Sequence, residues 1–179
     1  MDRRTTLLAA VVAAVGNLAA WAAKGAAQTA PVPGTATKGE PDMSDGQKNG
    51  VVGTWRLVRA TAIAADGKVL AAPYGGEKGM GRVILNADGR MMAVLCDGRP
   101  TLPAGAVREY SSYCGNYTFD GKTLITRVDA ASEASRIGSE QVRDVRFEGK
   151  LMVLRPPLRA YGSKPAEQRE LYWEKIADV

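Results

Sequence analysis

The stretch GRVILNADGRMMAVLC, residues 81–96, contains two apolar, strand-like segments on either side of a short turn. Segments 81–86 and 90–96 are rich in valine, isoleucine, leucine and methionine, and Ala-Asp-Gly joins them. An acidic residue followed by glycine suits a tight hairpin turn, because such turns need residues with positive φ. The stretch therefore predicts two antiparallel strands joined by a hairpin.

The same pattern continues along most of the chain. Asp-Gly or Glu-Gly pairs separate strand-like segments at 66–67, 88–89, 120–121 and 148–149. The nine segments predicted as strands are 51–64, 68–72, 81–86, 90–96, 111–119, 122–130, 140–147, 150–155 and 169–176. Successive hairpins favour a meander, and closing the meander removes its exposed edges. We therefore predict an all-β fold, an up-and-down antiparallel β-barrel of 8–9 strands with room for one small ligand.

The composition limits the chemistry that this barrel can perform. The 179 residues include no histidine, which excludes catalytic sets and zinc sites that depend on one. The formal net charge is +5, but the charges are scattered rather than gathered in a basic stripe. We therefore predict no catalytic residues of these types, no metal, no cofactor and no nucleic-acid partner.

The first 49 residues differ in composition from the rest of the chain. Residues 1–30 combine Arg3 and Arg4 with a short apolar run and then small residues, which predicts a signal peptide. The paired arginines favour the twin-arginine route, although Thr6 departs from its motif; an uncleaved amphipathic helix is the alternative. Residues 31–49 are predicted to be a flexible linker, and 50–179 the barrel domain. The mature protein is expected to be periplasmic or secreted, without a stable membrane span.

The two cysteines can be interpreted in two ways. In an oxidising compartment, an even number of cysteines favours a disulfide between Cys96 and Cys114. The alternative is two separate buried thiols. No histidine is available to activate either thiol for a reaction.

Several motifs together resemble the bacterial lipocalin-like domain family. In chain order they are GTWRLV (53–58), NADGRMMAVL (86–95), YCGNYTFDGKTL (113–124), IGSEQVRDVRFEGKLMVLRPP (137–157) and LYWEKI (171–176). The resemblance implies a calycin-type barrel with an internal cavity, used mostly for binding and occasionally by isomerases or cyclases. Relatives often carry a histidine in the strand after Asp-Gly, where this chain has Thr126 and Arg127.

The resemblance also implies a structural role for Trp55. In lipocalins the equivalent tryptophan packs across the closed end of the barrel, and an arginine from a late strand commonly lies on it. Arg143 or Arg169 is the expected partner here. Direct contact between Trp55 and a ligand is the alternative.

Strand alternation predicts which side chains face the interior. The face that carries Val145 and Phe147 also carries Gln141 and Arg143. By the same rule Tyr113 and Tyr117 share a face, and Arg59 shares one with Trp55. The candidate ligand-binding residues are therefore Arg59, Tyr113, Tyr117, Gln141 and Arg143. Their arginines either pair with groups inside the barrel or await an anionic ligand, because a buried arginine without a partner is costly. For Arg59 a position at the rim of the barrel, without a role in ligand binding, is a further alternative.

Three functions fit these observations. The first is an exported barrel that binds a small, mainly apolar molecule, which carries a negative charge if the arginines contact it. The second is an isomerase or cyclase that works without histidine, although Arg127 and Asp129 make no convincing inward acid–base pair. The third is a periplasmic protein-binding or inhibitor module. The oligomeric state is left open.

Overall fold

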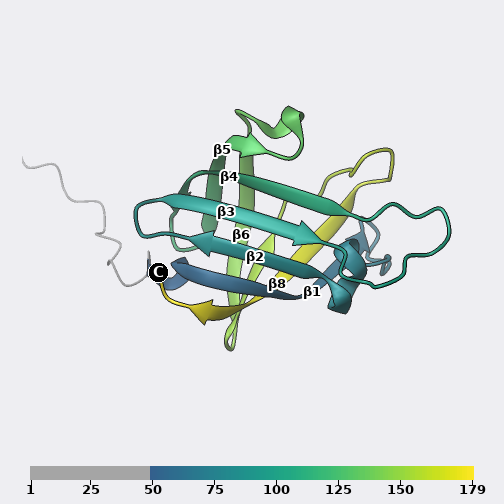
Figure 1. The fold of residues 1–179 in the computed structure, drawn as a ribbon, viewed down its shortest axis with the longest axis horizontal. Coiled ribbons are helices and arrows are strands. Elements are labelled where there is room, and N and C mark those ends of the chain that lie inside the picture. Colours follow the sequence, from purple (N-terminus) through teal and green to yellow (C-terminus); the bar gives the residue numbers. More distant parts are fainter. Residues whose placement is uncertain (1–48) are drawn as a thin grey trace, which may run out of the picture. The chain divides into compact units, whose positions relative to one another are not determined.

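The computed structural model describes residues 49–179, and these residues form eight strands and three short 3-10 helices (Figure 1). The predicted signal peptide and residues 31–48 of the predicted linker lie outside the described residues. The strands are β1 (Gly53–Ala64), β2 (Met80–Leu85), β3 (Arg90–Cys96), β4 (Tyr110–Phe119), β5 (Thr123–Ala131), β6 (Glu140–Glu148), β7 (Leu151–Arg155) and β8 (Glu167–Ala177). The 3-10 helices are η1 (Asn49–Val51), η2 (Pro73–Lys78) and η3 (Ala134–Arg136).

The strands form a closed barrel in sequence order, and β8 pairs with β1. Every neighbouring pair is antiparallel, so the predicted all-β, up-and-down barrel is confirmed. The predicted ninth strand at 68–72 is wrong. This segment makes a single bridge between Val69 and Ile63, and Pro73 follows it without an N–H to extend a ladder.

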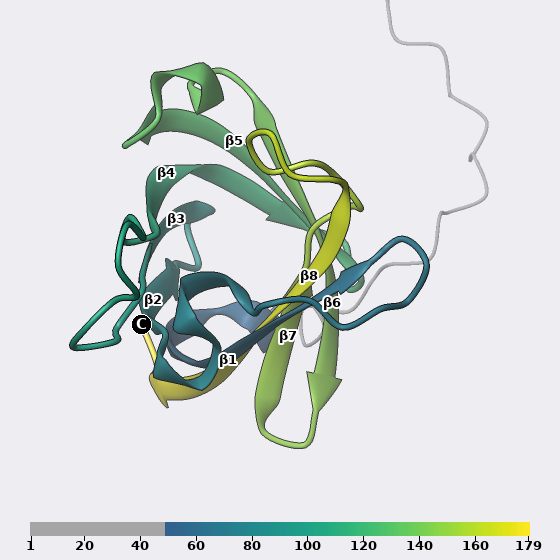
Figure 2. The same ribbon diagram turned by 90° about the vertical axis from the view of Figure 1, so that its right-hand side faces the viewer.

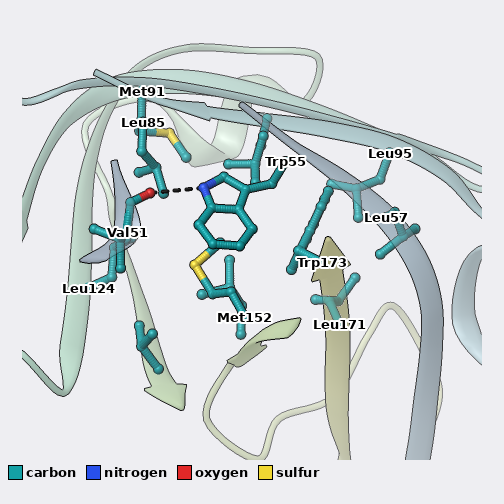
Figure 3. Close-up of a cluster of buried hydrophobic side chains, with 14 of the residues drawn as sticks. Val51, Trp55, Leu57, Leu85, Met91, Leu95, Leu124, Met152, Leu171 and Trp173 are labelled. Atoms are coloured by element: carbon teal, nitrogen blue, oxygen red, sulfur yellow. Dashed lines mark hydrogen bonds between the residues drawn. The ribbon is translucent and has the colours of Figure 1, made fainter. Parts of the chain in front are cut away.

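One end of the barrel is closed by a cluster of buried side chains around Trp55 (Figure 3). The Trp55 indole N–H donates to the Val51 carbonyl at 2.9 Å, and Met152 packs near its ring. Figure 3 shows Leu85, Met91 and Leu124 around the same ring. Because these side chains are buried and pack against one another, they close this end of the barrel.

The cation above Trp55 is a lysine rather than one of the expected arginines. The Lys175 ammonium lies 5.8 Å from the Trp55 ring centroid, because the ladder between β1 and β8 pairs these two residues. Arg143 and Arg169 lie at the other end of the interior. The expectation that one of them lies on Trp55 is therefore wrong.

A β-bulge in β1 reverses the direction of its side chains. Leu57 pairs with Trp173, but Arg59 pairs with the next residue of β8, Tyr172, so Val58 is the extra residue. Leu57 is buried before the bulge and Ala60 after it, while Arg59 is exposed. The prediction that Arg59 faces the interior is therefore wrong. Its guanidinium instead lies on the barrel's outer surface, 3.9 Å from the Tyr172 ring centroid.

We expect the Arg59→Ala substitution to lower the free energy of unfolding by about 0.5–1 kcal/mol, since it removes one exposed cation–π contact. Ligand binding inside the barrel should not change. Urea denaturation measures the first effect and a ligand titration the second. A clear loss of binding would show that Arg59 reaches the interior after all.

The two cysteines are free, so the disulfide, one of the two interpretations left open by the sequence, is not formed. In the ladder between β3 and β4, Cys96 lies opposite Tyr110 and Cys114 lies opposite Met92. This register separates the two cysteines by four residues, or about 13 Å along the strands. A disulfide needs Cα atoms within about 7 Å. The other interpretation, two separate thiols, is the one that the structure shows, and both thiols are half-buried.

Candidate functional site

The open end of the barrel carries the four longer connections between strands. They join β1 to β2, β3 to β4, β5 to β6 and β7 to β8, whereas tight turns join the strands at the closed end. Figure 2 views the barrel from the side on which the connections β3–β4 and β7–β8 project in Figure 1. Side chains from these connections and from the strand ends below them form the candidate site.

The interior beneath this end contains a small cavity of about 40 Å³. Its aliphatic lining residues are Val83, Ala93, Leu95, Leu154, Pro156 and Leu171, and its aromatic ones are Tyr74, Tyr113, Tyr161 and Trp173. The remaining lining residues are Ser111 and four arginines, Arg136, Arg143, Arg159 and Arg169. No aspartate or glutamate of the described chain is among them. The cavity is therefore cationic on its charged side and apolar elsewhere.

Arg143, from β6, is the most buried arginine without a carboxylate partner in residues 49–179. It is 7 % exposed. Its guanidinium donates to the Val142 carbonyl at 2.6 Å and to the Gln141 Oε1 at 3.4 Å. These two acceptors leave other N–H groups of Arg143 unused, because a guanidinium has five.

Arg159, in the connection between β7 and β8, is the second of the cavity-lining arginines without a carboxylate partner among the described residues. Its guanidinium lies 4.6 Å from the Tyr161 ring centroid, and its buried Nε has no hydrogen-bond partner within residues 49–179. An unpaired buried donor costs free energy. The Arg159 Nε is thus available to donate a hydrogen bond to an acceptor from outside the described residues.

Arg169, from β8, is held in place by both charge and stacking. Its Nε donates to the Glu167 carboxylate at 2.6 Å, and its guanidinium lies 3.6 Å from the Tyr161 centroid. Glu109 lies 3.9 Å away on another side. Arg169 therefore lines the cavity with its charge balanced by these two carboxylates.

Arg136, in η3, lies at the rim of the cavity. It donates to the Ser111 hydroxyl at 2.8 Å and lies 5.2 Å from the Tyr113 ring centroid. The Glu133 carboxylate is 3.9 Å away and exposed. Arg136 is therefore partly neutralised and closer to solvent than Arg143.

A left-handed turn places Tyr74 over this side of the barrel. Tyr74, Gly75 and Gly76 all have positive φ, and Tyr74 is the only non-glycine residue with positive φ in 49–179. The Tyr74 backbone N–H donates to the Glu109 carboxylate, which holds the strained conformation. Burial raises the pKa of the Tyr74 hydroxyl, so it stays a neutral hydrogen-bonding group.

Asp97 fixes the connection that packs against this turn. Its side chain is fully buried and accepts from the Arg99 backbone N–H at 3.0 Å and from the Arg99 guanidinium at 2.5–3.0 Å. A side chain added at Gly75 would meet the Asp97 carboxylate at 2.5 Å, so the two segments touch. The hydrogen bonds from Arg99 lower the pKa of Asp97 to about 2.

We expect Asp97 to make folding stability depend on pH in the acid range. Because the folded-state pKa is below the ordinary value, its contribution is complete above about pH 5 and is lost progressively as the pH falls through 2 towards about 1. Thermal melting of the wild type and of Asp97→Asn, followed between pH 6 and about pH 2, measures this. The two melting temperatures should converge at low pH, and a constant difference between them would contradict the assignment.

The structure brings together only part of the predicted site. Tyr113 and Arg143 line the cavity, and Gln141 is buried beside Arg143. Tyr117 lies elsewhere, with its hydroxyl donating to the Asn86 carbonyl at 2.8 Å near the closed end. Arg59, as described above, is outside.

The residues that prediction missed lie mostly on connections. Tyr74, Arg136, Arg159 and Tyr161 follow no strand alternation, so their directions could not be inferred from the sequence. Arg169 is different, because it shares a face of β8 with Leu171 and Trp173. Alternation in β8 could have placed it inside.

Two wider hollows adjoin the cavity at the open end. One, of about 350 Å³, shares Tyr74, Ser111, Arg136, Tyr161 and Arg169 with it. The other, of about 470 Å³, shares Arg136, Arg159 and Tyr161 and includes Gln141. Charged and hydroxyl side chains make up much of the lining of both, including Glu109, Glu133, Lys164, Ser132, Ser135, Ser139 and Glu140. The open end is thus polar outside and cationic within.

Within residues 49–179, no group of three or more cysteine, aspartate or glutamate side chains is arranged to hold a metal ion. No helix in that part of the chain has the length and apolar character needed to cross a membrane.

Comparison with known proteins identifies the kind of domain. A family model described as "Lipocalin-like domain" matches residues 52–176. A solved structure of an uncharacterized protein from Bacteroides eggerthii DSM 20697 is similar at 16 % identity and a TM-score of 0.36, covering 70 % of this chain and 98 % of that one. No curated protein matches the chain.

Proposed function

Because this chain belongs to the lipocalin-like domain family, whose barrel is in general a small-ligand-binding architecture, we propose that it binds a small molecule that carries a negative charge. The ligand enters the open end, where the arginines that line the cavity attract its charged group. Only a small part of it fits inside, since the cavity of about 40 Å³ is far below the ~300 Å³ or more of a typical drug-sized site.

One observation carries this proposal. The cavity is lined by four arginines and by no carboxylate of the described chain. Glu167 and Glu133 pair with two of these arginines, while Arg143 and Arg159 form no ion pair within residues 49–179. Since an unpaired buried charge is costly, an anionic ligand would stabilise this arrangement.

Binding of butyrate, with butyramide as its neutral counterpart of similar size, tests the proposal. We expect butyrate to shift the amide NMR signals of cavity residues and butyramide to shift them much less. The Arg143→Gln substitution should weaken butyrate binding about tenfold or more, because a hydrogen bond to a charged group contributes about 1.5–3 kcal/mol.

Arg82→Gln is the matched control. Arg82 is exposed on β2 and, like Arg143, donates to the carbonyl of the preceding residue, at 2.8 Å. Its substitution makes the same change in charge and should leave butyrate affinity unaltered. Equal effects of the two substitutions, or equal binding of acid and amide, would overturn the proposal.

We also propose that the protein acts in the periplasm or outside the cell. The arginine pair, short apolar run and small residues within 1–30 support this. Mass spectrometry of the protein purified from its native host should find an N-terminus near residue 30. An intact N-terminus in a cytoplasmic fraction would contradict export.

A further inference from the structure

The interior cavity and the hollows outside it differ greatly in size. The cavity has a volume of about 40 Å³, whereas the two adjoining hollows have volumes of about 350 and 470 Å³. A site for one water needs about 10–15 Å³ on a comparable measure, so the cavity holds only a few atoms. A ligand larger than this must therefore lie mostly outside the barrel's interior.

One of the residues that line the cavity has a buried hydrogen-bond donor without an acceptor. Trp173, from β8, is 1 % exposed and lines the cavity, and its indole Nε1 has no hydrogen-bond partner within residues 49–179. The other indole at the barrel's interior, Trp55, does have an acceptor, the Val51 carbonyl. Buried indole N–H groups normally find a partner. The free donor of Trp173 therefore indicates that an acceptor belongs in the cavity.

The donors around the cavity come from separate parts of the chain. Trp173 lies on β8, Arg143 on β6, and Arg159, whose Nε is also without a partner, in the connection between β7 and β8. All three residues line one cavity of only about 40 Å³. A carboxylate matches this set, because its two oxygens accept hydrogen bonds only and pair well with guanidinium groups.

We propose that the ligand binds head-first, with one carboxylate group inside the cavity against Arg143, Arg159 and the Trp173 N–H. The rest of the ligand lies in the polar hollows at the open end. This rests on the proposed function and names both the group recognised and its orientation. The opposite orientation would place an apolar end among these donors and leave them desolvated without acceptors.

The hollows outside support this orientation. Their lining includes Glu109, Glu133, Lys164 and several serines, so they favour a polar ligand body over a long alkyl chain. A tail-first ligand would need an apolar cavity that grows with the tail. The closed end offers no such space, since Trp55, Leu85 and Met152 fill it.

A series of straight-chain acids from acetate to octanoate distinguishes the two orientations. If the alkyl chain entered an apolar interior, affinity would rise about fourfold for each added methylene, from a gain of ~0.8 kcal/mol per methylene. Head-first binding predicts less than about a twofold rise per methylene beyond butyrate, because those methylenes remain outside. Titration calorimetry or NMR titration of the full-length protein measures the affinities.

The indole N–H signals give a second, independent measurement. We expect the Trp173 indole proton to move downfield when butyrate binds, because it gains a charged acceptor. The Trp55 indole proton, already bonded to Val51, should stay in place and serves as the internal control. Trp173→Phe, which keeps an aromatic ring but removes the donor, assigns the signal and should weaken butyrate binding about tenfold.

The outcomes separate the two proposals. A moving Trp173 signal and weak dependence on chain length support head-first binding. If acids bind but the Trp173 signal stays fixed, or affinity rises about fourfold per methylene, head-first binding is overturned while anion binding stands. If no acid in the series binds, both proposals fail.

Discussion

Replacing Trp55 with alanine is expected to lower the free energy of unfolding by about 4 kcal/mol, the range found when a large buried aromatic residue is truncated. Trp55 is 3 % exposed and sits among the side chains that close the barrel (Figure 3). Alanine would leave a cavity there and free the Val51 carbonyl, which accepts from the indole at 2.9 Å. Because whole domains are stable by only about 5–15 kcal/mol, the effect is large, and urea denaturation measures it.

Trp55→Phe is the control for this substitution. It keeps most of the packed ring but removes the hydrogen bond to Val51, so we expect a smaller loss of about 1–2 kcal/mol. A loss below about 1 kcal/mol for Trp55→Ala would mean that the closed end is not supported by this side chain.

Replacing Gly115 with alanine is expected to lower the free energy of unfolding by about 3 kcal/mol, the upper end of the usual cost of overpacking. Gly115 lies in β4 where the pairing with β5 shifts register, so that Asp129 is the extra residue. A Cβ at Gly115 would overlap the Arg127 backbone carbonyl. Backbone cannot move aside as a flexible side chain can, so the two strands would have to part.

Gly50→Ala is the matched control for this substitution. A Cβ at Gly50 meets the Phe147 ring at 3.8 Å, an ordinary contact, and the backbone there has no positive φ. We expect a change within about 0.5 kcal/mol for Gly50→Ala. Circular dichroism and urea denaturation of both variants make the comparison, and a Gly115→Ala protein as stable as the control would contradict the close approach.

The barrel could be predicted because its signals are local. Each Asp-Gly or Glu-Gly pair marks a turn by its own conformational preference, and the strands around it show their pattern within a few residues. Segment 68–72 was the exception. Its apolar residues resemble a strand, but whether a ladder extends there depends on partners that are distant in the sequence.

The site was only partly predictable, for two physical reasons. Alternation places a side chain correctly only while the pairing has no bulge, and the extra residue at Val58 reversed the direction of Arg59. Alternation also says nothing about connections, which supply Tyr74, Arg159 and Tyr161 to the cavity. Arg143 and Tyr113 lie on strand segments where alternation holds, and both line the cavity as predicted.

The bulge in β1 also allows the length of this strand to change without a change in the interior. Before Val58 the strand contributes Trp55 and Leu57 to the core, and after it the small side chains Ala60 and Ala62 face inward. Leu57 and Arg59 already lie opposite consecutive residues of β8. Loss of Val58 would therefore give a regular ladder in which Arg59 is still opposite Tyr172 and Ala60 still opposite Leu171. Arg59 would stay on the outer surface, so the cavity would keep the same four arginines in a strand that is one residue shorter.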